Sequence, residues 1–307
     1  SRRDPMTRLT GARVLLTGAT GLIGRATAVA LAGLGAEVIA LSRSGRSAPG
    51  AAHTVSCDLL DATSMTRVAS LGATHLVHLA WADGADRWHS PVNDDWADAT
   101  LALLRAFAES GGRRALIAGS CAEYDWTGPG LLAESAPLRP ATRYGRAKAR
   151  AGDAARAAAP GFGVSLVWAR PFFVYGPGEP GGRLVGDLVR GLRAGRMVDC
   201  TDGLQRRDFL YSGDLGQALA GLLASDATGS VNVASGSAIP VRDLIGEVAR
   251  QIGRPDLIRL GARPRPADDP AELCADVTLL TRATGFRPTH DLAAGVAALL
   301  AADGVTP

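Results

Sequence analysis

Lysine is almost absent from this chain of 307 residues. It holds 33 lysines and arginines together, and Lys148 is the only lysine among them. The exception is informative, because an ammonium is a compact donor that fits beside a phenol, whereas a guanidinium is a planar fork of fixed geometry. The net charge of +3 is small, and no run of basic residues occurs. The composition therefore gives no indication of nucleic-acid binding.

Cysteine is also scarce, and long apolar runs are missing. The four cysteines lie far apart and form no C-x-x-C pair. This spacing predicts neither a metal site nor a disulfide framework and favours a reducing, cytoplasmic setting. No apolar stretch has the length of a membrane span, and we find no signal-peptide pattern, so no membrane partner is expected. Residues 1–5 are left out of the fold prediction.

The first informative segment is a glycine-rich turn. The apolar run 13–17 predicts a buried strand that leads into Gly18, Gly21 and Gly24, then an alanine-rich helix to about residue 34 and a second strand over 37–41. In a strand–turn–helix–strand unit these glycines allow a tight turn, close approach of a pyrophosphate, and close packing of helix on strand. The segment predicts dinucleotide binding.

The end of the second strand lacks an acidic residue. Chains that bind NAD usually carry a carboxylate there for the ribose hydroxyls, but residues 41–46 contain Ser42, Arg43 and Arg46 and no acid. A guanidinium can pair with the 2′-phosphate of NADP(H). The alternative is that these arginines only solvate a loop. We predict NADP(H) as cofactor in preference to NAD(H).

Strands and helices alternate through the first half of the chain. Further apolar runs over 53–56, 75–80, 115–119 and 164–169 predict an α/β fold with a Rossmann-like, doubly wound parallel sheet. Residues 6–175 are predicted to form the dinucleotide-binding domain, with returning elements near 208–233. Residues 176–307 are predicted to form mainly a smaller, interleaved substrate lobe, with helices near 181–194, 212–224, 241–252 and 291–302.

Residues 81–96 form a polar segment with three tryptophans and His89, predicted to be a loop ahead of a helix over 98–110. Its place after a strand favours a role facing a ligand, although its aromatic residues are equally suited to packing a neighbouring lobe or a dimer. His75 and His78 lie within an apolar strand, and we interpret them as structural. A catalytic role for His89 is the less favoured interpretation.

Tyr144 and Lys148 are four residues apart, so on a helix both leave the same face. An exposed polar helix face explains the pair alone equally well. Ser120, at the end of the strand 115–119, precedes them by about twenty residues. The rest of the chain decides between a polar helix face and a functional pair.

These motifs together resemble the extended short-chain dehydrogenase/reductase family, in its branch of nucleotide-sugar epimerases, dehydratases and ketoreductases. The resemblance covers nearly the whole chain and includes residues 17–24, 171–177 and 205–209 and the spacing of Ser120 from Tyr124. It implies that Tyr144 is the general acid/base and that Ser120 donates a hydrogen bond to the substrate oxygen. It further implies that Lys148 holds the nicotinamide ribose and lowers the pKa of the phenol.

The resemblance also implies binding residues. Cofactor contacts are assigned to the glycine turn, the ends of the first strands and the two catalytic helix residues, namely Gly18, Thr20, Gly21, Leu22, Ile23, Gly24, Ser42, Arg43, Asp58, Leu59, Leu79, Ala80, Tyr144, Lys148, Pro171 and Phe172. Substrate contacts are assigned to Cys121, Phe173, Arg207 and Arg265, although packing explains Cys121 at least equally well. The two arginines would grip the diphosphate of a nucleotide sugar, although a surface role for Arg265 is a serious alternative.

Departures from the family pattern narrow the reaction. Sugar dehydratases follow their serine or threonine with Asp-Glu, whereas this chain has Cys121 and Ala122, so dehydration is disfavoured. Glu123 comes one position late and should point to the other side if the chain stays extended. Phe173 and Trp96 stand where the family commonly has asparagine, which indicates an altered sugar pocket.

The sequence predicts an NADPH-dependent reductase of a nucleotide-linked keto sugar, in particular a 4-keto-6-deoxyhexose. A nucleotide-sugar 4-epimerase with tightly bound NAD is the main alternative. A reductase of a small non-nucleotide carbonyl compound and a non-catalytic NADP sensor are also considered, and the intact Ser120, Tyr144 and Lys148 argue against the sensor. The resemblance suggests a homodimer through helices around 97–109 and 143–158.

Overall fold

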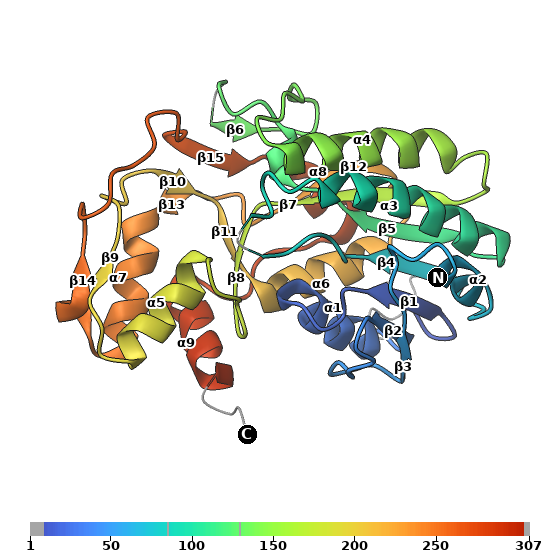
Figure 1. Ribbon diagram of the computed structural model, residues 1–307, viewed down its shortest axis with the longest axis horizontal. Coiled ribbons are helices and arrows are strands. Elements are labelled where there is room, and N and C mark those ends of the chain that lie inside the picture. Colours follow the sequence, from blue (N-terminus) through green and yellow to red (C-terminus); the bar gives the residue numbers. More distant parts are fainter. Residues whose placement is uncertain (1–8, 85, 129, 304–307) are drawn as a thin grey trace.

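A seven-stranded parallel sheet forms the centre of the fold. The computed structural model describes residues 9–84, 86–128 and 130–303. The strand order is β12-β7-β5-β4-β1-β2-β3, with every neighbouring pair parallel, and helices cover both faces (Figure 1). This is the predicted doubly wound α/β sheet. Its strands are β1 (Arg13–Thr17), β2 (Glu37–Ser42), β3 (His53–Ser56), β4 (His75–His78), β5 (Arg114–Ala118), β7 (Ser165–Pro171) and β12 (Gly229–Val233).

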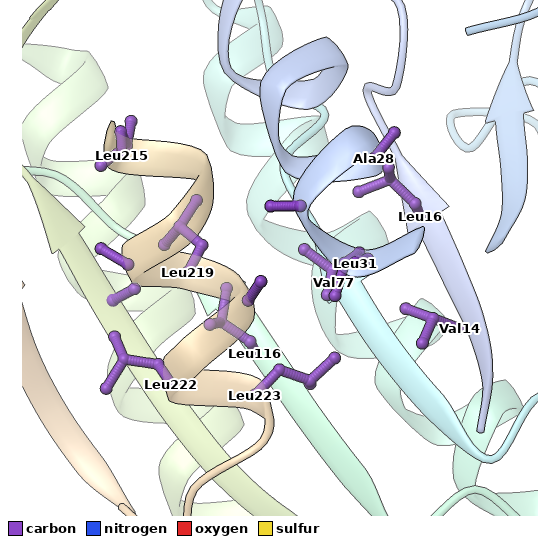
Figure 2. Close-up of a cluster of buried hydrophobic side chains, with 14 of the residues drawn as sticks. Val14, Leu16, Ala28, Leu31, Val77, Leu116, Leu215, Leu219, Leu222 and Leu223 are labelled. Atoms are coloured by element: carbon purple, nitrogen blue, oxygen red, sulfur yellow. The ribbon is translucent and has the colours of Figure 1, made fainter. Parts of the chain in front are cut away.

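Two apolar clusters, one on each face, hold the sheet between its helices. One face packs against α1 (Leu22–Gly33), α6 (Ser212–Leu223) and α8 (Thr278–Thr284), and the other against α2 (Ser64–Ala69), α3 (Val92–Glu109) and α4 (Arg143–Ala158). Leu16 belongs to the first cluster and its neighbour Leu15 to the second, since successive side chains of a strand point to opposite faces. This explains the unbroken apolar run of β1. Figure 2 shows the first cluster, where Leu31 and Leu219 meet strand residues such as Leu116.

A further apolar cluster lies beyond the carboxyl ends of the strands, at the left in Figure 1. It packs α5 (Leu184–Arg193), α7 (Val241–Ile252) and α9 (Leu292–Asp303) together. The remaining strands are short and lie outside the seven-stranded sheet: β6 (Leu131–Leu132), β8 (Phe173–Tyr175), β9 (Val198–Asp199), β10 (Arg206–Arg207), β11 (Phe209–Tyr211), β13 (Ile239–Pro240), β14 (Ile258–Arg259) and β15 (Glu272–Ala275), with the turn η3 (Pro255–Leu257). The predicted helices of this half match α5, α6, α7 and α9 within a few residues.

The tryptophan-rich segment departs from the prediction. It was expected to remain a loop to residue 96, but α3 already begins at Val92 and includes Trp96. Pro91 directly precedes the first turn, and Asp94 and Asp95 lie within it. A proline at the start of a helix costs no hydrogen bond, and acidic residues there interact favourably with the helix dipole. No helix in the described part of the chain is both long and apolar enough to cross a membrane.

Candidate active site

A glycine brings the tyrosine helix against the end of β5. After β5 the chain forms the 3₁₀ turn η2 (Cys121–Glu123), which Ser120 caps by accepting a hydrogen bond from the Ala122 amide at 3.1 Å. Helix α4 begins one residue before Tyr144. A Cβ atom on Gly145 would overlap the carbonyl oxygen of Ala122, so only glycine permits this approach. This approach brings Ser120 close enough to Tyr144 for the serine hydroxyl to influence the pKa of the phenol.

Tyr144 is enclosed by tryptophans from the segment after β4. The Trp88 ring meets the Tyr144 ring edge-on with 5.2 Å between centres, and the Trp81 ring does so at 6.4 Å. The Tyr144 amide also donates to the carbonyl oxygen of Trp88 at 3.1 Å. The tyrosine is therefore fixed by α4 on one side and by this segment on the other.

Burial raises the pKa of Tyr144 to about 12, and the Ser120 hydroxyl opposes this rise. The expected lowering of this pKa by Lys148 is not observed. The Lys148 ammonium lies 5.9 Å from the centre of the phenol ring, and the loss of hydration of the phenolate outweighs the charges nearby. Tyr144 is consequently a protonated phenol at neutral pH, which is the state that a proton donor requires.

Lys148 is buried, with 3% of its surface exposed. Its Nζ donates to the carbonyl oxygen of Ala118 at 2.7 Å and lies 3.7 Å from the centre of the Trp81 ring. Burial lowers the pKa of Lys148 to about 7, while the charge of Glu123 acts in the opposite direction. The one lysine of the chain thus lies near Tyr144 and is close to its protonation midpoint at neutral pH.

The Glu123 carboxylate is held by partners other than Tyr144. The chain turns at η2 instead of staying extended. The carboxylate accepts from Arg170 Nε at 2.8 Å, from Trp168 Nε1 at 3.0 Å and from the Ser120 amide at 2.8 Å. Both members of the Glu123–Arg170 ion pair are almost fully buried. This carboxylate is committed to holding the turn.

The two positions where dehydratases carry Asp-Glu offer no proton-transfer group here. Cys121 and Ala122 are both buried, and burial raises the pKa of the Cys121 thiol to about 12. The thiol therefore stays protonated at neutral pH. The structure provides a tyrosine, a serine and a lysine at this point, without the acid and base that elimination of water needs.

The glycine turn is built to receive a pyrophosphate. Gly18 has φ of +69°, and a Cβ atom there would lie 2.8 Å from the Ala80 amide nitrogen. A Cβ atom on Gly24 would overlap the carbonyl oxygen of Gly18. Gly21 caps α1 without a side-chain hydrogen bond, and the first turn has no acidic residue. The amides of this turn therefore suit an anionic group, and the residues present fit a dinucleotide.

The segment after β4 is tied to this turn by Thr17. Its Oγ1 accepts from the amides of Leu79 and Ala80, both at 3.1 Å. His78 lies between Thr17 and Thr100, with ring-nitrogen contacts of 2.7 Å and 3.0 Å, and burial lowers its pKa to about 3. The structural interpretation of His78 is confirmed.

At the end of β2 the predicted ribose side of the cofactor site is open. Arg43 and Arg46 are exposed, and neither forms an ion pair with a described residue. Ser42 is nearly buried and donates to the carbonyl oxygen of Arg46 at 3.2 Å. Asp58 is exposed and accepts from the Leu60 amide at 3.1 Å. Of the remaining predicted cofactor residues, Thr20 is exposed in the glycine turn, and Leu22 and Ile23 are the first two residues of α1. Leu59, after β3, is buried, as are Pro171 and Phe172 at the end of β7.

The predicted substrate residues gather on one side of η2. The Arg207 guanidinium lies 5.6 Å from the centre of the Phe173 ring and interacts electrostatically with both Cys121 and Arg265. Arg207 is buried, however, and its guanidinium forms an ion pair with Asp269 and donates to two backbone carbonyl oxygens at 2.8 Å. Arg265 is partly exposed, with only a long contact of 3.7 Å to Asp202.

Other residues near Tyr144 were not identified from the sequence. Arg183, just before α5, carries a charge that favours the phenolate of Tyr144, and Arg87 interacts with the same phenol. Nothing in the local pattern distinguishes these two from the other arginines. His89 is exposed, and its side chain forms no hydrogen bond or ion pair with a described residue. In the described ranges no group of three or more His, Cys, Asp or Glu side chains is placed to hold a metal ion.

Comparison with known proteins assigns the family. Residues 14–234 match the model of the NAD dependent epimerase/dehydratase family. The chain belongs to this family. It is an extended short-chain dehydrogenase/reductase, as the motifs indicated, and the family is NAD(P)-dependent.

Individual members of the family give finer comparisons. The dTDP-4-dehydro-6-deoxy-D-allose reductase of a Streptomyces species is 28% identical over 92% of this chain and 93% of that protein. The dTDP-6-deoxy-L-talose 4-dehydrogenase (NAD(P)(+)) of Kitasatospora kifunensis is 30% identical over 96% of this chain and 97% of that protein. Among solved structures, MoeE5 in complex with UDP-glucuronic acid and NAD has a TM-score of 0.80 and 31% identity, covering 94% of this chain and 98% of that one.

Proposed function

We propose that this protein uses NADPH to reduce the carbonyl group of a nucleotide-linked keto sugar, in particular a 4-keto-6-deoxyhexose. The observation that carries the proposal is the placement of Tyr144, half-buried, beside Ser120 and 5.9 Å (ring centre) from the Lys148 ammonium, next to a glycine turn that fits a dinucleotide. A phenol at this place can give its proton to a carbonyl oxygen as hydride reaches the carbonyl carbon. Two relatives that are named for chemistry at carbon 4 of a 6-deoxy sugar support the same reaction.

Each residue of the site then has a defined task. NADPH, when bound, supplies the hydride. Tyr144 gives its phenolic proton to the carbonyl oxygen. Ser120, whose hydroxyl oxygen accepts from the Ala122 amide, would donate its hydroxyl proton to the same oxygen. The Lys148 ammonium compensates the negative charge that develops on the phenol, and Arg207 and Arg265 would bind the diphosphate once the carboxylate partner of Arg207 is displaced.

The cofactor preference is part of the proposal. The exposed Arg43 guanidinium, at the end of a strand without an acid, suits the 2′-phosphate of NADPH. Arg43→Ala should raise the KM for NADPH about tenfold or more, because a charge-assisted hydrogen bond is lost, and change the KM for NADH little. Arg196→Ala, an exposed arginine of the other lobe, is the matched control. Equal changes for the two cofactors would show that Arg43 does not read the phosphate.

An epimerase is the second candidate, because the matching family is described by epimerase activity and because epimerisation uses the same tyrosine, serine and lysine. The two are separated by following oxidation of NADPH and NADH with a panel of nucleotide-linked 4-keto sugars. Stoichiometric oxidation of NADPH is expected. Interconversion of sugar epimers by protein that carries its own NAD, without oxidation of either added cofactor, would overturn the reductase assignment.

The predicted division of the chain at residues 175 and 176, the cytoplasmic location and the homodimer also belong to this proposal. The dimer would form through α3 and α4, whose side chains are joined within one chain by the Arg143–Asp94 and Arg150–Asp98 ion pairs. Analytical ultracentrifugation tests the assembly, and a monomer at micromolar concentration would remove it.

A further inference from the structure

Trp81 touches both members of the catalytic pair. The Lys148 Nζ lies 3.7 Å from the centre of its ring, within the range of a cation–π contact. The Tyr144 ring stands edge-on to the same indole, at an interplanar angle of 89°. The sequence predicted a ligand-facing role for the tryptophan-rich segment as a whole, but no task for this residue.

The Trp81 ring is held in place from two directions. Its indole nitrogen donates to Asn93 Oδ1 at 2.8 Å, and its face stacks on Trp96 with 6.2 Å between ring centres. Asn93 is fully buried and donates in turn to the carbonyl oxygens of Arg87 and Ser90, at 2.7 Å and 2.8 Å. The first turns of α3 therefore fix the position of the Trp81 ring.

Apart from the Trp81 ring, few groups around Lys148 stabilise its positive charge. Its only hydrogen-bond acceptor among the described residues is the carbonyl oxygen of Ala118. Three charged or titratable groups face the ammonium. His78 from β4 is neutral above pH 3, and Tyr144 belongs to the same helix as the lysine. Glu123 from η2 is the third, and its carboxylate is paired with Arg170. A buried ammonium with one acceptor is costly, and the π face of Trp81 compensates part of that cost.

We infer that Trp81 is a positioning residue that stabilises the Lys148 ammonium through its ring face and directs it toward Tyr144. The contribution of Trp81 to the reaction rests on the proposed function, whereas its contact with Lys148 does not. Without the ring, Lys148 should lose its proton at lower pH, and the charge near Tyr144 would be missing when the phenol gives up its proton.

The single lysine makes this measurable without any substrate. Protein grown with isotope-labelled lysine gives one side-chain resonance, and its pH titration reports the pKa of Lys148. Trp81→Leu should lower the midpoint by about 1.5 pH units, the size of a desolvated cation–π contact. Trp81→Phe keeps a ring face and should shift the midpoint by clearly less. Trp88→Leu, which removes a ring that contacts Tyr144 but not Lys148, should leave it unchanged.

A second measurement avoids any change in packing. Fluorine atoms on tryptophan, incorporated during growth, withdraw electron density from the face of every indole ring. The Lys148 titration midpoint should therefore fall in the protein of natural sequence and stay unchanged in Trp81→Phe. In the activity assay, Trp81→Leu should lower kcat and move its pH profile, with recovery in Trp81→Phe. An unchanged midpoint in both Trp81→Leu and the fluorinated protein would overturn the inference. Absence of ketoreductase activity with the midpoint shifts intact would overturn only the proposed function.

Discussion

Burial, more than charge, sets the properties of the residues at the centre of the site. It raises the pKa of the Tyr144 phenol and lowers that of the Lys148 ammonium. The two groups are therefore drawn toward their neutral forms, and neither forms an ion pair with the other. A neutral phenol beside a serine hydroxyl is an arrangement that gives a proton to an incoming carbonyl oxygen, and the lysine charge matters after that proton has left.

Tyr144→Phe removes only the proton that the account assigns to the substrate oxygen. We expect kcat to fall by about a hundred- to ten-thousand-fold, the range for loss of a general acid, with NADPH affinity almost unchanged. Tyr211→Phe is the matched control, since the Tyr211 hydroxyl makes no hydrogen bond in the described structure and lies in the other lobe. Full activity of Tyr144→Phe would refute the role of the tyrosine.

Residue type and spacing predicted Ser120, Tyr144 and Lys148, because one helical turn and one strand end define their positions locally. The same reasoning could not predict the Trp81–Lys148 contact or the Arg207–Asp269 ion pair, since each joins residues that are far apart in the chain. It also predicted the wrong direction for the pKa of Tyr144, because burial is a property of the folded molecule and cannot be read from neighbouring residues.

Among the elements, the contact of α4 with η2 decides the geometry of the site. Gly145→Ala places a methyl group on the carbonyl oxygen of Ala122 and should push α4 away from Ser120. We expect kcat to fall about a hundredfold, as for a misplacement of about 1 Å, with the circular dichroism spectrum preserved. Gly246→Ala in α7 meets no atom within 4 Å and should keep full activity. Equal activities of the two variants would contradict this account of α4.

The turn η2 depends in turn on the buried Glu123–Arg170 ion pair. Glu123→Ala leaves a buried guanidinium without its carboxylate and should lower the free energy of unfolding by about 3–5 kcal/mol. Glu272→Ala breaks the exposed pair with Arg206 and should cost about 0–1 kcal/mol. Urea denaturation measures both. Similar losses would mean that the buried pair has no special weight in holding the turn.

At the scale of elements the sequence pattern was reliable where apolar periodicity is strong. It was wrong at the start of α3, where the polar first turn hid the helix, and at η2, where three residues are too few to carry a period. Both errors fall in segments that border Tyr144, because residues that serve the site interrupt the regular pattern there.

For the whole molecule, the buried lysine predicts a pH dependence of stability. The folded pKa of about 7 lies below the ordinary value of 10.5, so between these pH values the unfolded chain holds a proton that the folded chain lacks. Stability should therefore rise with pH across this window, by about 1.4 kcal/mol per pH unit, relative to Lys148→Met. Urea denaturation of both proteins over this range gives the difference. A constant difference would show that Lys148 is not destabilised as an ammonium by burial.

The proposed reaction is tested most directly by tracing the hydride. NADPH that carries deuterium at the transferable position is incubated with a nucleotide-linked 4-keto-6-deoxyhexose, and the sugar product is analysed by mass spectrometry and NMR. The account predicts one deuterium on the former carbonyl carbon for each NADPH oxidised, and with Tyr144→Phe the same incorporation slowed by about a hundred- to ten-thousand-fold. Sugar epimers that interconvert without gaining deuterium would contradict it.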